Sequence, residues 1–170
     1  PPGVRLLVVR PFKIGDTSTA GGVTGKVNEL ELFTTTITTP DNRKIIVPNK
    51  IIGADTITNF AGYETRRCDV SVGVDYDKDC DDVRAALEES LGLVELKISE
   101  PAPQIFLVGL GGSSVDWQVR VWCKTTDYFV VHEQIVRAIH KKLTEKGIGI
   151  PYPQMDVHLD PQVVSALASK

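Results

Sequence analysis

Residues 151–159 have the sequence PYPQMDVHL, and this stretch near the end of the chain decides the fold. Its two prolines exclude a helix at this point and favour an extended backbone. After the prolines, polar and apolar side chains alternate, which is the period of a β-strand with two different faces: Gln154, Asp156 and His158 on one, Met155, Val157 and Leu159 on the other. Because a lone strand is unstable, this strand needs partners.

The residues before this strand, about 62–152, have the hydrophobic periodicity of a mixed α/β domain. Alternating apolar residues predict strands over 68–74 and 115–121, and an apolar run predicts a third over 104–110. The glycines of Gly109-Leu110-Gly111-Gly112 predict a hairpin between the last two. In chain order, one helix follows the strand over 68–74 and a second follows the strand over 115–121, before the closing strand. This order matches the ferredoxin-like split βαβ arrangement, with the alternative that the closing strand has left that sheet.

Two apolar stripes at helical spacing predict the two helices of this domain. The first stripe is Val83, Leu87 and Leu91, and either Asp79 or Asp81 can cap its start. The second helix is predicted to begin at Asp127 and to stop at Gly147, and its stripe consists of Val131, Ile135, Ile139 and Leu143. Trp117 and Trp122 lie on opposite faces of their strand, so one of them is expected in the core.

The leading block, residues 10–61, reads as short β-strands. Gly21-Gly22 and Gly25 predict turns near its beginning, and residues 30–39 are rich in β-formers and predict a strand. Pro40-Asp41-Asn42 predicts a turn between that strand and a second one over 44–47. Closely spaced short strands favour a small barrel or sandwich. The predicted class is therefore α+β, with a β domain followed by an α/β domain.

Composition and charge narrow the function classes. The chain is 42% hydrophobic and 24% charged with a net charge of −3, which excludes disorder and argues against nucleic-acid binding. Residues 1–50 hold seven Lys or Arg and four Asp or Glu, a balance of +3, whereas residues 51–170 hold twelve and eighteen, a balance of −6. The basic leading end would suit an anionic membrane surface.

Several features bear on compartment and completeness. The three cysteines are widely spaced, which favours free thiols in a reducing compartment. No secretory signal and no apolar run long enough to span a bilayer is visible, and the only methionine is Met155. The sequence is therefore expected to be a fragment or a processed product.

No catalytic, cofactor or metal site is predicted. Gly22-Val23-Thr24-Gly25-Lys26 fails as a phosphate loop because Ala20 and Val27 stand where Gly and Ser or Thr are required. The aspartates from Asp75 onward fail as a calcium loop because its sixth position is Cys80. The glycines near residue 110 precede a strand where a dinucleotide site needs a helix. The histidines lack partners at metal-ligand spacing.

Motifs spread over most of the chain resemble the soluble part of an MscS-type small-conductance mechanosensitive channel. Each motif alone is weak, but their order and spacing together are specific to that family. They are Arg10-Pro11-Phe12-x-x-Gly15-Asp16, Gly22-Val23-x-Gly25-x-Val27, Ile46-Val47-Pro48-Asn49, Asn59-Phe60, Gly73-Val74-x-Tyr76-Asp77, Trp117-x-Val119-Arg120-Val121-Trp122 and Pro151-Tyr152-Pro153-Gln154-Met155-Asp156-Val157.

The resemblance implies a domain plan. Residues 1–9 would end a pore-lining helix, 10–61 would form an Sm-like β domain, and 62–152 a ferredoxin-like α/β domain. Residues 153–160 would add a strand to a parallel β-barrel shared between subunits, and 161–170 would be a tail. The transmembrane helices would lie upstream of Pro1.

The resemblance also implies a function. The chain would be the cytoplasmic vestibule of a homoheptameric inner-membrane channel that releases ions and small osmolytes under membrane tension. It would contact lipid only through the missing transmembrane region, and it would need no cofactor and act as no enzyme. The alternative is an Sm-like or ferredoxin-like nucleic-acid-binding module, which the acidic second block and the 6% aromatic content disfavour.

Residue roles follow from the same resemblance. Met155 and Val157 are predicted to line the barrel, because seven Asp156 carboxylates in a narrow tube would repel one another. Further positions are expected at subunit interfaces and portals: Gln154, Asp156, Asn59, Phe60, Pro151, Tyr152 and Pro153. Arg10, Pro11 and Phe12 are expected near the membrane.

Overall fold

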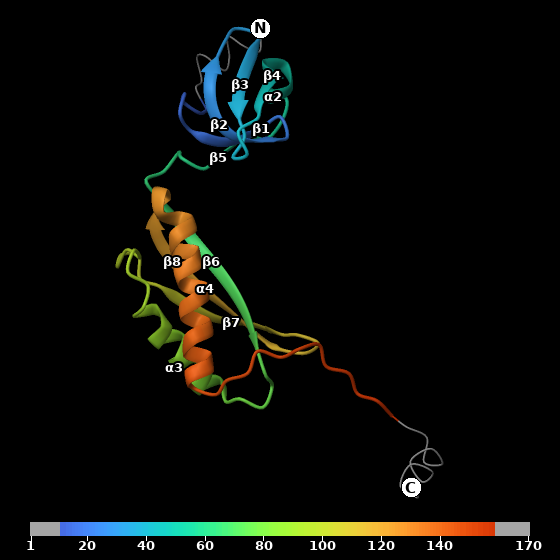
Figure 1. Cartoon of the computed structure of the whole chain (residues 1–170), viewed down its shortest axis with the longest axis vertical. Helices are drawn as coiled ribbons and strands as arrows, with labels where there is room; N and C mark the ends of the chain where they lie inside the picture. The colour runs from blue at the N-terminus through green and yellow to red at the C-terminus, as the bar shows by residue number, and fades with distance from the viewer. Residues whose placement is uncertain (1–10, 159–170) are drawn as a thin grey trace, which may run out of the picture. The chain divides into compact units, whose positions relative to one another are not determined.

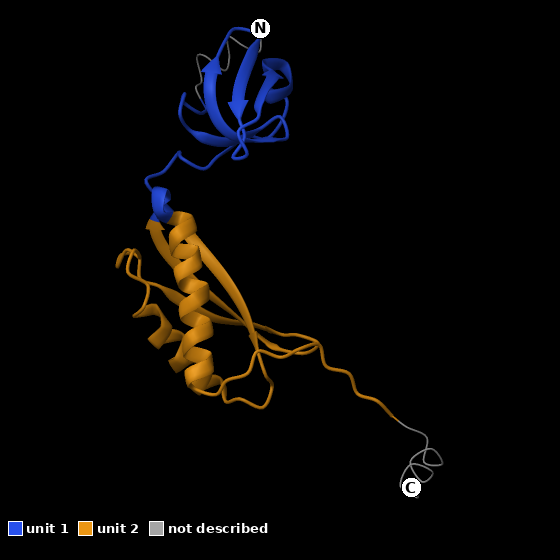
Figure 2. Cartoon of the chain, viewed as in Figure 1, with its two compact units in different colours: residues 1–66, 124–127 blue, residues 67–123, 128–170 orange. Residues whose placement is uncertain are grey.

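The structure is a computed structural model that describes residues 11–158. The chain divides into two compact units, shown in separate colours in Figure 2. The first unit runs to Arg66 and also includes residues 124–127, and the second comprises residues 67–123 together with the chain from Tyr128 onward. Both units combine sheet and helix, so the predicted α+β class is confirmed.

The first unit is a five-stranded antiparallel sheet (Figure 1). Its strands are β1 (Thr17–Ala20), β2 (Val23–Leu30), β3 (Thr34–Thr38), β4 (Lys44–Pro48) and β5 (Thr58–Asn59), in the order β4-β3-β2-β1-β5. The short helix α2 (Asn49–Ile52) follows β4. The buried core of this unit consists of Phe12, Ala20, Val27, Ile37, Val47 and Ile52.

Two details of this sheet differ from the prediction. The turn between β1 and β2 uses Gly21 and Gly22, whose φ angles are +56° and +76°, but Gly25 lies inside β2 and not in a turn. The predicted strand over 30–39 is in fact interrupted, because β2 ends at Leu30 and β3 begins at Thr34. The buried Asn49 side chain holds that interruption by donating to the carbonyl oxygens of Glu31 (2.8 Å) and Leu32 (3.1 Å).

The second unit packs two helices on one face of a three-stranded sheet (Figure 1). Its elements are β6 (Thr65–Val74), α3 (Cys80–Leu91), β7 (Gln104–Leu110), β8 (Val115–Lys124), a 3-10 turn (Thr125–Asp127) and α4 (Tyr128–Glu145). The strand order β6-β8-β7 is that of the first, third and second strands of a ferredoxin-like sheet. Within residues 11–158, the chain after α4 adds no fourth strand to this sheet.

The sequence patterns of this unit are confirmed in detail. The four stripe residues of α4 are buried, as are the alternating Val115, Trp117, Val119 and Val121 of β8. Asp79 is the residue that caps α3, since its carboxylate accepts a hydrogen bond from the amide of Asp81 at 2.8 Å. Trp117 is the core tryptophan, whereas Trp122 is only half-buried.

Among the described residues, no helix combines the length and the apolar character needed to cross a membrane.

Candidate functional site

The candidate site is the closing segment, residues 151–158, together with the elements that fix where it leaves the second unit. Helix α4 ends just before it in a Schellman motif, in which Gly147 (φ +64°) donates to Thr144 at 3.1 Å and Ile148 donates to Leu143 at 2.9 Å. Ile148 is buried in the core, so the chain reverses at a fixed point.

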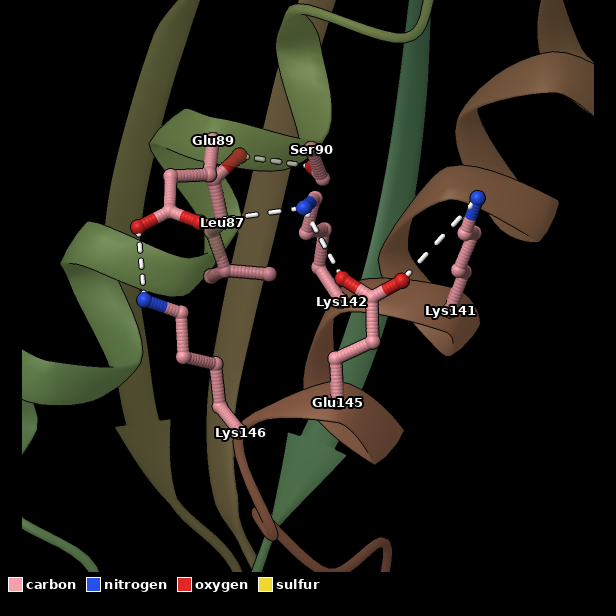
Figure 3. A network of polar contacts seen from close by, with 7 residues as sticks. All are labelled: Leu87, Glu89, Ser90, Lys141, Lys142, Glu145 and Lys146. Atoms are coloured by element: carbon pink, nitrogen blue, oxygen red, sulfur yellow. Dashed lines mark hydrogen bonds and ion pairs between the residues drawn. The ribbon is translucent and has the colours of Figure 1, made fainter.

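An ionic cluster ties the last turn of α4 to α3 (Figure 3). Lys146 Nζ lies 2.7 Å from Glu89 Oε1, and Lys142 Nζ lies 2.9 Å from Glu145 Oε2. The hydrogen bond from Lys146 lowers the pKa of the Glu89 carboxyl, and the bond from Lys142 lowers the pKa of Glu145. Both acids are therefore charged at neutral pH, and the cluster steadies the helix end from which the closing segment emerges.

Two backbone contacts then direct the closing segment past the tip of the β7–β8 hairpin (Figure 1). The amide of Asp75 donates to the carbonyl of Gly149 at 3.1 Å, and the amide of Gln154 donates to Ser113 Oγ at 3.1 Å. The tip is itself held by Tyr76, whose hydroxyl donates to the carbonyl of Gly111. The hairpin and the end of β6 thus form a seat for the start of the segment.

Beyond this seat the closing segment has no strand partner among residues 11–158. Residues 151–158 are extended and pair with no strand of the part of the chain that the structure describes. Met155 is 84% exposed and Val157 is 69% exposed. Two apolar side chains on one face of an exposed extended segment make a surface that another chain can cover.

The predicted residues from the first unit lie elsewhere. Asn59 links its neighbours, because its amide donates to Asp16 Oδ2 at 2.9 Å and to the Pro11 carbonyl at 3.3 Å. Phe12 is buried in the β-unit core, and the Phe60 ring lies 5.1 Å below the guanidinium of Arg66. Arg10 lies outside the described residues.

The predicted site residues therefore fall in two groups. One group, Pro151, Tyr152, Pro153, Gln154, Met155, Asp156 and Val157, is consecutive in the closing segment. The other group, Pro11, Phe12, Asn59 and Phe60, belongs to the first unit, where a hydrogen bond joins Asn59 to Pro11. Their interface, portal and membrane roles stay predictions. Among residues 11–158, no group of three or more His, Cys, Asp or Glu could hold a metal ion.

Comparison with known proteins identifies the family. Residues 2–62 match the family model described as "Mechanosensitive ion channel, beta-domain", and residues 68–150 match "Mechanosensitive ion channel MscS, C-terminal". The chain belongs to the MscS family of mechanosensitive ion channels. The MscS resemblance of its motifs is thereby confirmed.

Individual relatives agree with this assignment. An uncharacterized MscS family protein of Synechocystis is 42% identical over 92% of this chain and 53% of its own length. The small-conductance mechanosensitive channel of Edwardsiella ictaluri is 40% identical over 92% of this chain and 55% of its own length. The chain thus spans about half the length of these MscS relatives.

A solved MscS structure has the same fold. The crystal structure of Helicobacter pylori MscS in the closed state superposes with a TM-score of 0.86, at 29% identity, over 95% of this chain and 64% of that one. The two units of this chain are therefore the β domain and the C-terminal domain of an MscS protein.

Sequence reasoning missed the residues that seat the closing segment. Tyr76 stood in a family motif and Ser113 directly follows the glycines that predicted the hairpin, but nothing in the sequence predicted the contacts of either residue. Both contacts join residues at least 35 positions apart, so no local period could signal them. Gly149 was also unmarked, although a Cβ there would collide with the Asp75 carboxylate.

Proposed function

We propose that this chain is the cytoplasmic vestibule portion of a mechanosensitive channel that releases ions and small osmolytes when membrane tension rises. The observation that carries the proposal is the match of both units to the domains of that channel family, in order and over most of the chain. The exposed closing segment supports it further, because a vestibule assembled from several copies supplies the missing partners of that segment.

The proposed assembly is a homoheptamer at the cytoplasmic face of the cell's inner membrane. Seven closing segments would form a parallel barrel at the base, which removes every open strand edge from that sheet. Met155 and Val157 would line this barrel, while Gln154, Asp156 and His158 would face outward. The cation-rich leading end would lie nearest to the anionic lipid surface.

The work of opening would come from the membrane. Tension favours the channel state with the larger in-plane area, so it shifts the population toward the open state by that difference in work. The vestibule would then act as a sieve through which ions and small osmolytes pass. The charge lining its openings would bias which ions enter, since a charged opening changes the local ion concentration.

An osmotic-shock experiment tests this function. We expect that the full-length protein, expressed in bacteria that lack their own tension-gated channels, raises survival after transfer to dilute medium. A control variant with Gly25 replaced by Asp, which the β2–β3 contact cannot accommodate, should give no protection. Full membrane expression without any gain in survival would contradict the proposal.

A nucleic-acid-binding role receives no support. It requires a basic, aromatic sheet surface, whereas the open face of the β6-β8-β7 sheet carries Asp69 and Asp116 beside its arginines.

A further inference from the structure

Strand β7 leaves an unprotected edge on the sheet of the second unit. In the order β6-β8-β7, the outer side of β7 has no neighbouring strand among the described residues. Its seven residues, Gln104–Leu110, have the sequence QIFLVGL, with no charge and no proline. Such a strand is a template for pairing with another chain unless something covers it.

The other edge strands in the structure have features that hinder pairing with another chain. Edge strand β4 has Lys44 at its start and Pro48 at its end, and β5 is only two residues long. Edge strand β6 carries Arg66, Arg67 and Asp69. Charges, proline and short length are the devices by which proteins keep strand edges from associating. Their absence from β7 singles this strand out.

Apolar side chains are exposed on both faces of this edge. Phe106 lies opposite Gln118, on the face without helices, whereas Leu107 and Leu110 lie opposite Trp117 and Val115, on the helix face. The exposed fractions are 38% for Phe106, 44% for Leu107, 53% for Val108 and 74% for Leu110. The exposed side chains of β7 are therefore apolar on both faces, and the nearby charges are the guanidinium of Arg120 over the Phe106 ring (4.6 Å) and that of Arg84.

The backbone of this edge is only partly satisfied. Arg84 of α3 donates from Nη1 to the carbonyl of Ile105 at 3.0 Å, which shows that Ile105 directs its backbone groups away from β8. Alternate residues of an antiparallel edge strand face the same way, so Leu107 also directs its backbone outward. The bulge between Leu107 and Gly109 ends this alternation.

We propose that a neighbouring copy of this chain covers the β7 edge. The edge runs directly into the hairpin tip, Gly111–Ser114, where Ser113 Oγ accepts the amide of Gln154 at 3.1 Å. It is thus continuous with the closing segment, which is the part of the chain that the proposed vestibule brings against other copies. The exposed side chains of β7 itself are apolar, which fits a protein surface better than a nucleic acid or a lipid headgroup.

The contact is heterologous, so that the edge of one copy meets a different surface of the next. Pairing of β7 with β7 would be a two-fold contact and would stop at a dimer, whereas a ring requires a head-to-tail contact. This inference rests on the proposed assembly, and it adds a second contact to the one made by the closing segments.

Charge substitution at the bulge tests the proposal in the full-length protein. Val108→Lys places a cation on the edge, where it is harmless in one copy but would be buried unpaired between two. Val136→Lys is the matched control, because Val136 is a valine of similar exposure (43%) that belongs to α4 and not to β7. Native mass spectrometry should show the dissociation constant raised about tenfold or more by Val108→Lys and unchanged by Val136→Lys.

Amide exchange gives an independent readout. The Leu107 amide should exchange slowly in the assembled wild type and rapidly in the dissociated Val108→Lys variant, whose circular dichroism should match that of the wild type. Equal assembly of the two lysine variants, or rapid Leu107 exchange in the wild-type assembly, would overturn the edge contact and leave the proposed function standing. A wild-type protein that never assembles would overturn both.

Discussion

Gly25 shows how a single residue holds the β unit together. It lies inside β2, and a Cβ at this position would collide with the carbonyl oxygen of Thr38 and lie 2.8 Å from Cγ2 of Ile37, both on β3. The close approach of the two strands therefore depends on the absence of a side chain. Because the obstacle is backbone, it cannot move aside as a flexible side chain would.

Replacing this glycine should destabilise the protein. We expect Gly25→Ala to lower the free energy of unfolding by about 1–3 kcal/mol, the usual cost of overpacking, as measured by urea denaturation. Gly112→Ala is the control, since a Cβ at Gly112 would meet no atom within 4 Å. Equal stability of both variants would show that β2 and β3 are not so close.

At this scale, the sequence predicted buried residues well and close approaches poorly. Val131, Ile135, Ile139 and Leu143 were recognised because a helix repeats every few residues and places them on one stripe. Gly25 was assigned to a turn instead, because its constraint comes from Thr38, thirteen positions away. A contact across strands leaves no periodic mark on the sequence.

Among the helices, α3 depends on the cap at its start. Asp79 accepts the Asp81 amide at 2.8 Å, which satisfies one of the free N–H groups of the first turn. We expect Asp79→Ala to cost about 1 kcal/mol in the free energy of unfolding. Asp77→Ala should cost much less, because its exposed pair with Lys78 is long at 3.8 Å. A larger loss for Asp77→Ala would argue against the cap.

The ionic cluster between α3 and α4 makes the folding stability of the protein depend on pH (Figure 3). The pKa of Glu89 is lowered in the folded state by Lys146, relative to an ordinary value of 4.5. The stabilisation is therefore complete above pH 4.5 and is lost as the pH falls through the lowered pKa. We expect Glu89→Gln to destabilise the protein at pH 7 and to make little difference at about pH 3.

Chemical denaturation at the two pH values in low salt would measure this difference. A double-variant cycle with Lys146→Met isolates the pair from the rest of the cluster. The same wild-type-to-variant difference at both pH values would mean that the pair does not contribute.

Elements were predicted in kind but not always in extent. Alternation and glycines were enough for the β7–β8 hairpin, whose turn and flanking strands were placed correctly. The break between β2 and β3 was missed because residues 31–33 contain neither glycine nor proline. The buried Asn49 side chain fixes it from a distance, and the four-residue helix α2 that begins there was not predicted either.

For the whole molecule, the two faces of the closing segment make a prediction about assembly. We expect Met155→Asp to weaken assembly of the full-length protein about tenfold or more, because carboxylates from every copy would converge and repel inside the barrel. His158→Asp, on the opposite face, should assemble like the wild type. Analytical ultracentrifugation in detergent measures both, and the reverse pattern would mean that the polar face lines the barrel.

The sequence indicated that the chain assembles with other copies but not which contacts hold the assembly together. Alternation in PYPQMDVHL indicated a strand that needed partners, and the structure leaves residues 151–158 extended and exposed in the single chain. In the proposed assembly the partners of this strand belong to other copies, and a single chain carries no contact that specifies them. The proposed assembly therefore rests on family membership. The order of the motifs along the chain identifies the family, whereas no contact within one chain identifies the assembly.

Patch-clamp recording of the full-length protein tests the proposed channel function most directly. The protein would be expressed in bacterial spheroplasts that lack their own tension-gated channels, and suction would be applied to excised patches. We predict a current that appears above a threshold of tension and disappears when the tension is released. Patches that contain the protein but pass no tension-dependent current would contradict its function as a mechanosensitive channel.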